Sequence, residues 1–589
     1  MQPRRNCTPA RSAILVLALL LAPLGAGRAE AQRSDIVARL PARTIMFVEW
    51  RGMGAVNADM NQNHVLQMMA DPAMAPLWVG LAADLQKSQQ KSKAPAPPLS
   101  LPEVVSLLQN PVAAGIIETP HAVAGPRAAK PAAPVATFIV YDATGKEGLI
   151  EKWEAATETR GPMPQHYDFK GTSIAERTYA NGNSDYTAMA GHYFVSSSKK
   201  EVIEDLITRY GTAAAPADSI ARQLEYEEVR KFIGSDAALD YFARVPNLRE
   251  WTAAGAKDKN SANALKFISG LHLEKVHAMG GAVSFAGEAM RTRGEILGDT
   301  QPVGPFDIAG ASEGSFRTLA IAGGAPEFTV SRVDFGALYR LVMEAVGAVL
   351  PPQQAATIQS AQGMAQGFLG MPIQDALSLF TGEVASASSF SSDGAQERVF
   401  AATIEKPDAV LRILRAVLGP MTLAEDSYGS ATTLDIAYPY RDPLTGFTRR
   451  KMYYVAVTPQ MLVVAPRKAM LLETIEGLQS HGHEAAAPSA KGVFADRQYA
   501  TMRALLPEKL SGLGAENLAQ IPWDAVWAHF EQQAGQTSKQ AQHISKTAYS
   551  PDYSWMKLVN PEVIPRHLHM AVSGWWKDAN GVYFDAYVQ

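Results

Sequence analysis

The stretch YFVSSSKKEVIEDLITRY, residues 193–210, combines a strand pattern, a polar turn and a helix pattern. After the turn, apolar residues recur at the spacing of one helix face: Val202, Ile203, Leu206, Ile207 and Tyr210. The stretch MLVVAPRKAMLLETIEGL, residues 461–478, has the same order, with Arg467 and Lys468 in the turn. The two stretches predict a strand followed by a helix that packs on a sheet, present twice in the chain.

The segments around both stretches also correspond. Before each one lies a strand followed by a helix, then a run of short strands, and a hairpin closes each half of the chain. These segments are residues 136–156, 172–191 and 282–297 in the first half, and residues 398–420, 432–457 and 571–588 in the second. The opening strands are expected at TIMFVEW from Thr44 and at FRTLAIAGG from Phe316.

These patterns predict an α+β protein made of two similar halves, residues 32–300 and 301–589. Each half is expected to hold an antiparallel or mixed sheet, built as strand, helix, meander and helix, and covered by helices. One large α+β domain with accidental echoes is the alternative. Two segments rich in proline and alanine or polar residues, 86–98 and 120–134, are expected to be exposed excursions of the first half.

The N-terminal segment has the features of a signal peptide. Basic residues precede the short apolar run SAILVLALLLA, and Ala29 and Ala31 form the A-x-A pattern that signal peptidase accepts. We therefore expect cleavage after residue 31 and a soluble protein in the periplasm or outside the cell, with no transmembrane segment after signal removal. The alternative is that the segment stays attached as an anchor.

Composition excludes several classes of chemistry. The single cysteine, Cys7, lies in the expected signal, so the remaining chain has no residue for a disulfide or a thiolate site. Removal of residues 1–31 would change the net charge from −4 to −7, because the segment holds four arginines and one glutamate. We see no basic stripe with interleaved aromatic residues, and we expect no nucleic-acid partner.

The serines and lysines of the turn at 196–200 raise the possibility of a phosphate cradle. A phosphate-binding loop needs glycines, and this turn has none, while its counterpart carries Pro466 where an N–H donor would be required. Ser198 and Glu201 instead have the S-x-x-E spacing of a capping box. We interpret the turn as a helix cap.

The segment GASEG, residues 310–314, matches the G-x-S-x-G pattern of a nucleophilic serine at Ser312. Histidines that could act as a base follow later in the chain: His481, His483, His567 and His569. A helix should follow such an elbow, whereas the next residues have a strand pattern. We therefore interpret the segment as a glycine-rich linker and keep a serine hydrolase as an alternative.

Two patterns could bind metal. His567 and His569 would point to one side of a strand, and Met60, His64 and Met68 would share one helix face with ligands that suit Cu(I). His481 and His483 form a second histidine pair, in an expected loop, and spacing places no third ligand beside either pair. A methionine-rich core that includes Leu66 and Met69 explains the helix pattern as well. A periplasmic copper binder therefore remains an alternative.

Tryptophans gather near the C-terminus. Trp575 and Trp576 are adjacent in a strand pattern, so their side chains should point to opposite faces and one could be exposed. An exposed indole could stack on a sugar or on a partner, and packing beneath a loop is the alternative.

The opening phrase LPART, residues 40–44, and two later motifs give the chain a family resemblance. TGE at 381–383 belongs to a strand pattern, and KPD at 406–408 begins a helix pattern. With these motifs the chain resembles a group of exported bacterial proteins that share a domain of unknown function and open with LPADT. Here Arg43 replaces the acidic residue. The resemblance implies no catalytic residue.

We therefore expect a non-catalytic protein that binds a ligand or partner, or that serves as an envelope scaffold. No catalytic, cofactor-binding or metal-binding residue is assigned, and no cofactor is expected. The partner could be an envelope component or a peptide held in a cleft between the halves.

Overall fold

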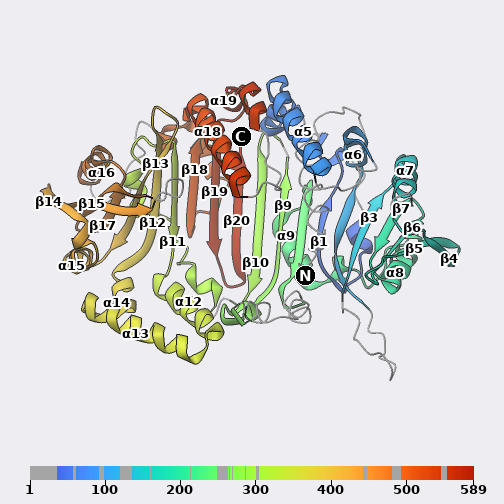
Figure 1. Ribbon diagram of the computed structural model, residues 1–589, viewed down its shortest axis with the longest axis horizontal. Coiled ribbons are helices and arrows are strands. Elements are labelled where there is room, and N and C mark those ends of the chain that lie inside the picture. The colour runs from blue at the N-terminus through green and yellow to red at the C-terminus, as the bar shows by residue number, and fades with distance from the viewer. Residues whose placement is uncertain are drawn as a thin grey trace. The chain divides into compact units, whose positions relative to one another are not determined.

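A computed structural model gives the three-dimensional structure of the chain (Figure 1). It describes residues 36–57, 61–91, 99–119, 135–158, 161–212, 214–247, 263, 266–267, 269–285, 287–299, 304–441, 447–480, 492–544 and 553–589. The chain forms two compact units. The first holds residues 1–255, 277–295 and 531–563, and the second holds residues 256–276, 296–530 and 564–589.

The first unit contains an antiparallel sheet with the strand order β10-β9-β8-β1-β2-β3-β7-β6-β5-β4. Its strands are β1 (Thr44–Trp50), β2 (Val112–Glu118), β3 (Val135–Asp142), β4 (Gln165–Phe169), β5 (Thr172–Thr178), β6 (Ser184–Ala190), β7 (Tyr193–Ser197), β8 (Leu239–Arg244), β9 (Val276–Ser284) and β10 (Met290–Gly298).

The second unit contains an antiparallel sheet with the order β20-β19-β18-β11-β12-β13-β17-β16-β15-β14. Its strands are β11 (Glu327–Arg332), β12 (Phe380–Phe390), β13 (Gln396–Ile404), β14 (Thr422–Tyr428), β15 (Ala431–Arg441), β16 (Thr448–Val457), β17 (Met461–Ala465), β18 (Gly512–Asn517), β19 (Met570–Lys577) and β20 (Gly581–Val588). Strand for strand, this is the order of the first unit.

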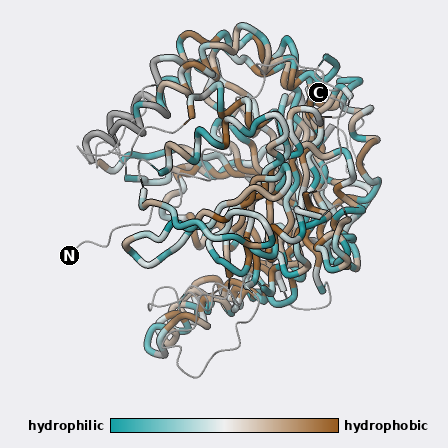
Figure 2. The backbone as a smooth tube through the Cα atoms, turned by 90° about the vertical axis from the view of Figure 1, so that its right-hand side faces the viewer, coloured by the Kyte–Doolittle hydropathy of each residue, from teal (hydrophilic) through white to brown (hydrophobic). Residues whose placement is uncertain are grey.

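Helices on corresponding connections cover corresponding strands. α8 (Lys200–Tyr210) packs on β6 and β7, and α16 (Lys468–Ser480) packs on β16 and β17. The expected apolar stripe of α8 is buried, and so are Leu471 and Ile475 of α16. α7 (Glu147–Glu158) follows β3, and α15 (Pro407–Leu418) follows β13. Figure 2 shows that hydrophobic, brown segments alternate with hydrophilic, teal segments along the chain.

The two helices of the second unit cover opposite faces of its sheet. Ala456 belongs to the apolar cluster that contains Leu471 of α16, whereas Val455 and Val457 belong to the cluster that contains Val410 of α15. Because neighbouring residues of a strand point to opposite faces, the two clusters lie on the two sides of β16. The unit therefore has three layers, with helices on both sides of the sheet.

The remaining helices lie mainly in three connections. Between β1 and β2 are α3 (Gly54–Asn57), α4 (His64–Ala70), η1 (Pro72–Met74), α5 (Ala75–Lys91) and α6 (Leu101–Leu107). Between β11 and β12 are α12 (Phe335–Val349), α13 (Pro352–Leu369) and α14 (Ile373–Ser378). Between β18 and β19 are η8 (Leu518–Gln520), α18 (Trp523–Ile544), η9 (Tyr553–Leu558) and α19 (Val563–His567).

Short helices also join the strands elsewhere. In the first unit α2 (Ile36–Arg39) precedes β1, and η2 (Ile220–Arg222) and α9 (Leu224–Ile233) precede β8. The other short helices are η3 (Leu273–Lys275), η4 (Pro305–Ile308), η5 (Arg317–Ala322), η6 (Gly419–Met421), η7 (Val493–Ala495) and α17 (Arg497–Arg503). Among the residues that the structure describes, no helix has both the length and the apolar character needed to cross a bilayer.

The structure confirms the α+β class and the antiparallel sheets, and it corrects two local predictions. The strand expected from Phe316 is the 3-10 helix η5, and the opening strand of the second unit is β11. Ser198 does not cap α8, because Lys199 occupies the N-cap position and makes no side-chain cap bond. The Ser198 hydroxyl instead accepts a hydrogen bond from Thr137 N at 3.0 Å.

Several predictions fall on residues outside the described ranges. They include the signal peptide at 1–31 with Cys7, and the segment at 120–134. Of the other expected excursion, residues 86–91 form the last turns of α5, whereas 92–98 are not described.

Candidate functional site

A surface pocket of about 660 Å³ lies in the second unit, where the end of β19 meets the segment before η5. Its lining combines an indole, two amines, a hydroxyl, a carboxylate and two methyl groups: Trp576, Lys509, Lys577, Ser312, Asp578, Ala311 and Ala579. The lining therefore mixes one flat apolar surface with groups that can hydrogen-bond.

Backbone pairing gathers these residues from distant parts of the chain. Glu313 and Leu510 form an antiparallel bridge, which places the segment of Ser312 beside Lys509. Ser511 N donates to Trp575 O at 2.9 Å, and the register of β18 and β19 continues from that point with Gly512 opposite Trp575. Three segments separated by tens to hundreds of residues thus meet where β18 begins and β19 ends.

The Ser312 hydroxyl is occupied by hydrogen bonds to neighbouring chain segments. It accepts a bond from Lys577 N at 3.1 Å, and it lies 3.2 Å from Lys577 O and 2.9 Å from Ser511 Oγ. Ser511 Oγ in turn donates to Gly310 O at 2.8 Å. These bonds use both the donor and the acceptor of Ser312, which therefore ties the end of β19 to the 310–314 segment.

The geometry around Ser312 differs from that of a nucleophile elbow. The residue is followed by the bridge at Glu313 and then by a 3-10 helix, not by an α-helix that continues directly from a strand. Within the part of the chain that the structure describes, its hydroxyl contacts Ser511 and Lys577, and neither is a histidine or a carboxylate, the common bases for activating a serine. The structure thus gives Ser312 a positioning role, although it is not in the flexible linker that the sequence suggested.

Trp576 supplies the flat surface of the pocket. Its ring stacks on Tyr583 with centroids 5.7 Å apart and planes at 15°, and this contact with β20 restricts the orientation of the indole. Lys577 Nζ donates to Phe306 O at 2.8 Å, and this hydrogen bond fixes the position of the amine. Lys509, also in the lining, is exposed.

The candidate metal residues are not brought together as expected. His567 ends α19 and His569 precedes β19, so the two do not share a strand face. α4 begins at His64 after the N-cap Asn63, and therefore the expected helix from 59 to 69 does not exist as one element. Met60, His481 and His483 lie outside the described residues. Within the described residues, no group of three or more His, Cys, Asp or Glu could hold a metal ion.

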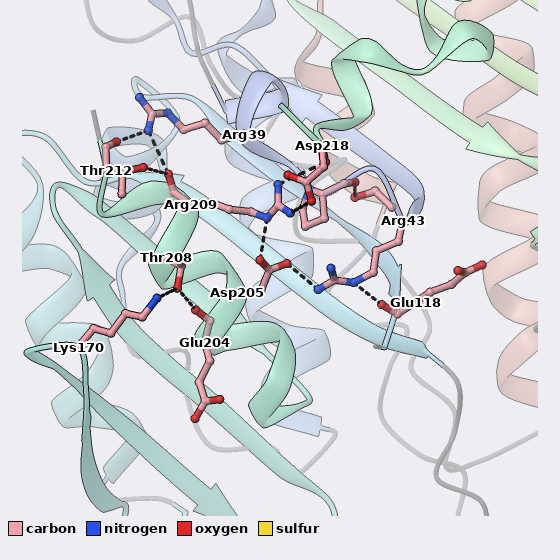
Figure 3. A network of polar contacts seen from close by, with 12 residues as sticks. Arg39, Arg43, Glu118, Lys170, Glu204, Asp205, Thr208, Arg209, Thr212 and Asp218 are labelled. Atoms are coloured by element: carbon pink, nitrogen blue, oxygen red, sulfur yellow. Dashed lines mark hydrogen bonds and ion pairs between the residues drawn. The ribbon is translucent and has the colours of Figure 1, made fainter. Parts of the chain in front are cut away.

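Arg43, the residue that departs from the LPADT phrase, belongs to a polar network in the first unit (Figure 3). Asp205 of α8 accepts from Arg43 Nη2 at 2.6 Å through one oxygen, and from Arg209 Nε at 2.8 Å through the other. Arg209 also donates to Asp218 at 2.5 Å. Arg39 donates to Arg209 O at 3.1 Å, so the network fastens the entry to β1 onto the end of α8.

Arg209 and Asp218 of this network stabilise each other's ionised forms. Burial opposes the charge of Arg209, but the carboxylates of Asp218 and Asp205 outweigh burial and raise the pKa of Arg209. The hydrogen bond from Arg209 lowers the pKa of Asp218. Four of the charged residues are paired with opposite charge, namely Arg43, Arg209, Asp205 and Asp218, and Arg39 donates to backbone oxygens. This pairing favours a structural role over ligand binding.

The TGE motif also has a structural role. Glu383 is buried, and its carboxylate accepts from Thr318 N at 2.5 Å and Thr318 Oγ1 at 2.6 Å, at the start of η5. Arg332 Nη2 lies 3.6 Å from the same carboxylate, and its guanidinium lies over the Phe316 ring at 4.2 Å. In the KPD motif, Lys406 has φ of 52° and Pro407 begins α15.

The pocket could not be predicted from the sequence, because no local pattern links Lys509, Ser312 and Lys577. Two separate patterns, the pair at Trp575 and Trp576 and the GASEG segment with Ser312, each supplied one part of its lining. Comparisons of the chain with protein-family models, with curated proteins and with solved structures return no match.

Proposed function

We propose that this chain is an exported protein, periplasmic or extracellular, and that it binds a small ligand without transforming it. The N-terminal pattern at residues 1–31 supports export. The observation that carries ligand binding is the pocket of the second unit, in which Trp576 offers a ring surface and Lys509 a cation. The hydrogen bonds of Ser312 support a role without catalysis, because the hydroxyl is already used.

The lining favours a ligand that has both a ring face and a negative charge. An indole stacks on the apolar face of a pyranose or on an aromatic ring, and an ammonium group pairs with a carboxylate. Acidic sugars combine both features, and they are the ligand class that we propose for this pocket.

The same strand order in both units supports a duplication of one ten-strand module as the origin of the chain. The ligand pocket belongs to the second unit, so we propose that the copies diverged and that one of them acquired binding. Membership in the LPADT-type group of exported proteins is part of the same proposal.

Ligand binding is tested by thermal unfolding of the purified chain with glucuronate, using glucose as the neutral control. Glucuronate should raise the melting temperature more than glucose does. Lys509→Gln should weaken glucuronate binding about tenfold or more, because it removes a charge-assisted hydrogen bond. Lys231→Gln, which removes an exposed lysine of the first unit, should leave the affinity unchanged. Equal responses to the two sugars would contradict the proposed ligand class.

Export and the absence of catalysis need separate measurements. Cell fractionation and N-terminal sequencing should find the mature protein outside the cytoplasm, beginning at Gln32. A fluorophosphonate probe should not label the chain, and labelling that disappears in Ser312→Ala would favour the serine hydrolase. Copper that copurifies with the chain and is lost in His64→Ala would favour the metal binder.

A further inference from the structure

The hairpin of β15 and β16 extends beyond the core of the second unit. The two strands stay paired as far as Arg441 opposite Thr448. Beyond the half-buried Met452 and the buried Ala437, residues 438–441 and 447–451 are exposed on both faces of the hairpin. We call these residues the basic ribbon. Its four paired positions extend roughly 13 Å.

The basic ribbon concentrates positive charge and aromatic rings on a chain that is acidic as a whole. Its exposed side chains include four cations and three aromatic rings: Arg441, Arg449, Arg450, Lys451, Tyr438, Tyr440 and Phe447. Tyr440 lies opposite Arg449 and Tyr438 lies opposite Lys451, so both pairs share one face. The sequence analysis found no such set, because the residues become neighbours only when the two strands pair.

The corresponding hairpin of the first unit lacks this extension. β5 and β6 have 7 residues each, whereas β15 has 11 and β16 has 10. Residues 172–190 contain a single basic residue, Arg177, and it is buried. One unit forms the same sheet without a ribbon, and therefore folding does not require it.

We propose that the basic ribbon docks the protein on a bilayer surface that contains anionic phospholipid. Phe447 is 73 % exposed and adjoins Thr448 in the last pair of the hairpin, so its ring can enter the boundary between headgroups and acyl chains. Arg449 and Lys451 follow at the depth of the lipid phosphates, and the tyrosine rings lie beside them, as tyrosine does at membrane interfaces.

Duplex nucleic acid would use the same charges, but its bases are stacked on one another and offer no ring face to the exposed Phe447. The lipid surface also fits an exported protein, and to that extent the inference rests on the proposed function. Vesicle binding by the purified chain tests the ribbon whether or not the chain is exported, and cell fractionation tests export by itself.

The experiment is cosedimentation of the full chain with vesicles of phosphatidylcholine alone, or with about one third phosphatidylglycerol. Binding should require phosphatidylglycerol and should fall when salt shortens the Debye length. The double variant Arg449→Gln/Lys451→Gln should lower the partition coefficient about tenfold or more, since each surface cation contributes roughly fivefold. Phe447→Ser should weaken binding even at low salt.

The matched control is Arg222→Gln/Lys231→Gln, which removes the same charge from exposed positions of the first unit and should bind as the unchanged chain does. Circular dichroism should show that all variants are folded. No binding to phosphatidylglycerol vesicles, or equal binding by the ribbon and control variants, would overturn the proposal. Ribbon-dependent binding to duplex DNA without vesicle binding would also overturn it.

Discussion

Arg209 shows how one buried residue can hold three segments together through its side chain and its backbone carbonyl. Its guanidinium joins α8 to Asp218, and its carbonyl oxygen receives Arg39. The position that corresponds to Arg209 in the second stretch of the sequence is Gly477, so the network belongs to the first unit alone. The sequence pattern placed α8 correctly but gave no indication of the partners of its polar residues.

Arg209→Met should lower the free energy of unfolding of the first unit by about 2 kcal/mol. Loss of one partner of a fully buried pair costs about 3–5 kcal/mol, and the cost here is smaller because Asp218 is 68 % exposed. Lys200→Ala removes an exposed ion pair with Glu204 on the same helix and a cation–π contact with Tyr167, and it should cost less than about 1 kcal/mol. Urea unfolding followed by circular dichroism measures both, and equal costs would contradict the role assigned to Arg209.

The stability of the second unit should depend on pH through His272. Its ring nitrogens lie 2.8 Å from Glu344 and 3.0 Å from Glu274, and these hydrogen bonds raise the pKa of His272 above its usual 6.5. The protonated ring is favoured by folding, so its contribution is fully present below about pH 6.5. That contribution is lost as pH rises through the raised pKa.

An NMR titration of the His272 ring measures this effect. The pKa of His272 should lie above 6.5, and Glu344→Gln should lower it, because the strongest of the two hydrogen bonds to a carboxylate is lost. The effect on stability should stay below about 1 kcal/mol, because all three side chains are partly exposed. A pKa of His272 at or below 6.5 in the unchanged chain would be inconsistent with its hydrogen bonds to Glu274 and Glu344.

At the scale of elements, helix and strand periodicity predicted much of what the structure contains. The paired stretches at 193–210 and 461–478 form β7–α8 and β17–α16. The strand predicted from Phe316 was wrong. The segment forms a 3-10 helix that contacts the buried carboxylate of Glu383, and the apolar residues of such a short helix have the periodicity of a strand. The predicted cap at Ser198 was wrong because its hydroxyl accepts a hydrogen bond from Thr137 N of strand β3 instead.

The packing of α5 against η9 could not be foreseen, since more than 400 residues separate them. Trp555 Nε1 donates to Asp84 at 3.1 Å, and a Cβ added at Gly80 would lie 2.1 Å from Trp555 Cγ. Gly80→Ala should therefore displace the indole and lower the free energy of unfolding by about 1–3 kcal/mol.

Gly148→Ala is the matched control for this contact. Gly148 also lies on a helix of the first unit, but an added Cβ there meets no atom within 4 Å. This substitution should stabilise the protein by about 0.5–1 kcal/mol through helix propensity. If both substitutions change stability in the same direction, Trp555 does not pack on α5.

At the scale of the whole molecule, the two units each contain ten strands in the same order. The order of local patterns suggested a repeat, and the strand pairing has the same order in each unit. The exchange of residues 256–276 and 531–563 between the sequence halves was not predictable, because long insertions carry no signal of the unit on which they pack. The pocket residues were likewise united by pairing, not by spacing.

Engineered cysteine pairs test the repeated arrangement most directly, because Cys7→Ser leaves a chain without cysteine. Ile139 lies opposite Ser196 in β3 and β7, and Phe400 lies opposite Val464 in the corresponding strands β13 and β17. Cysteines at either of these pairs should form a disulfide under mild oxidation, since opposed residues of neighbouring strands are close enough. Peptide mapping under non-reducing conditions detects each bond.

Pairs shifted by one residue, Ile139→Cys with Val195→Cys and Phe400→Cys with Val463→Cys, point to opposite faces and should remain reduced. The account predicts disulfides at both opposed pairs and at neither shifted pair. A disulfide in one unit but not at the corresponding pair of the other, or at a shifted pair, would contradict it.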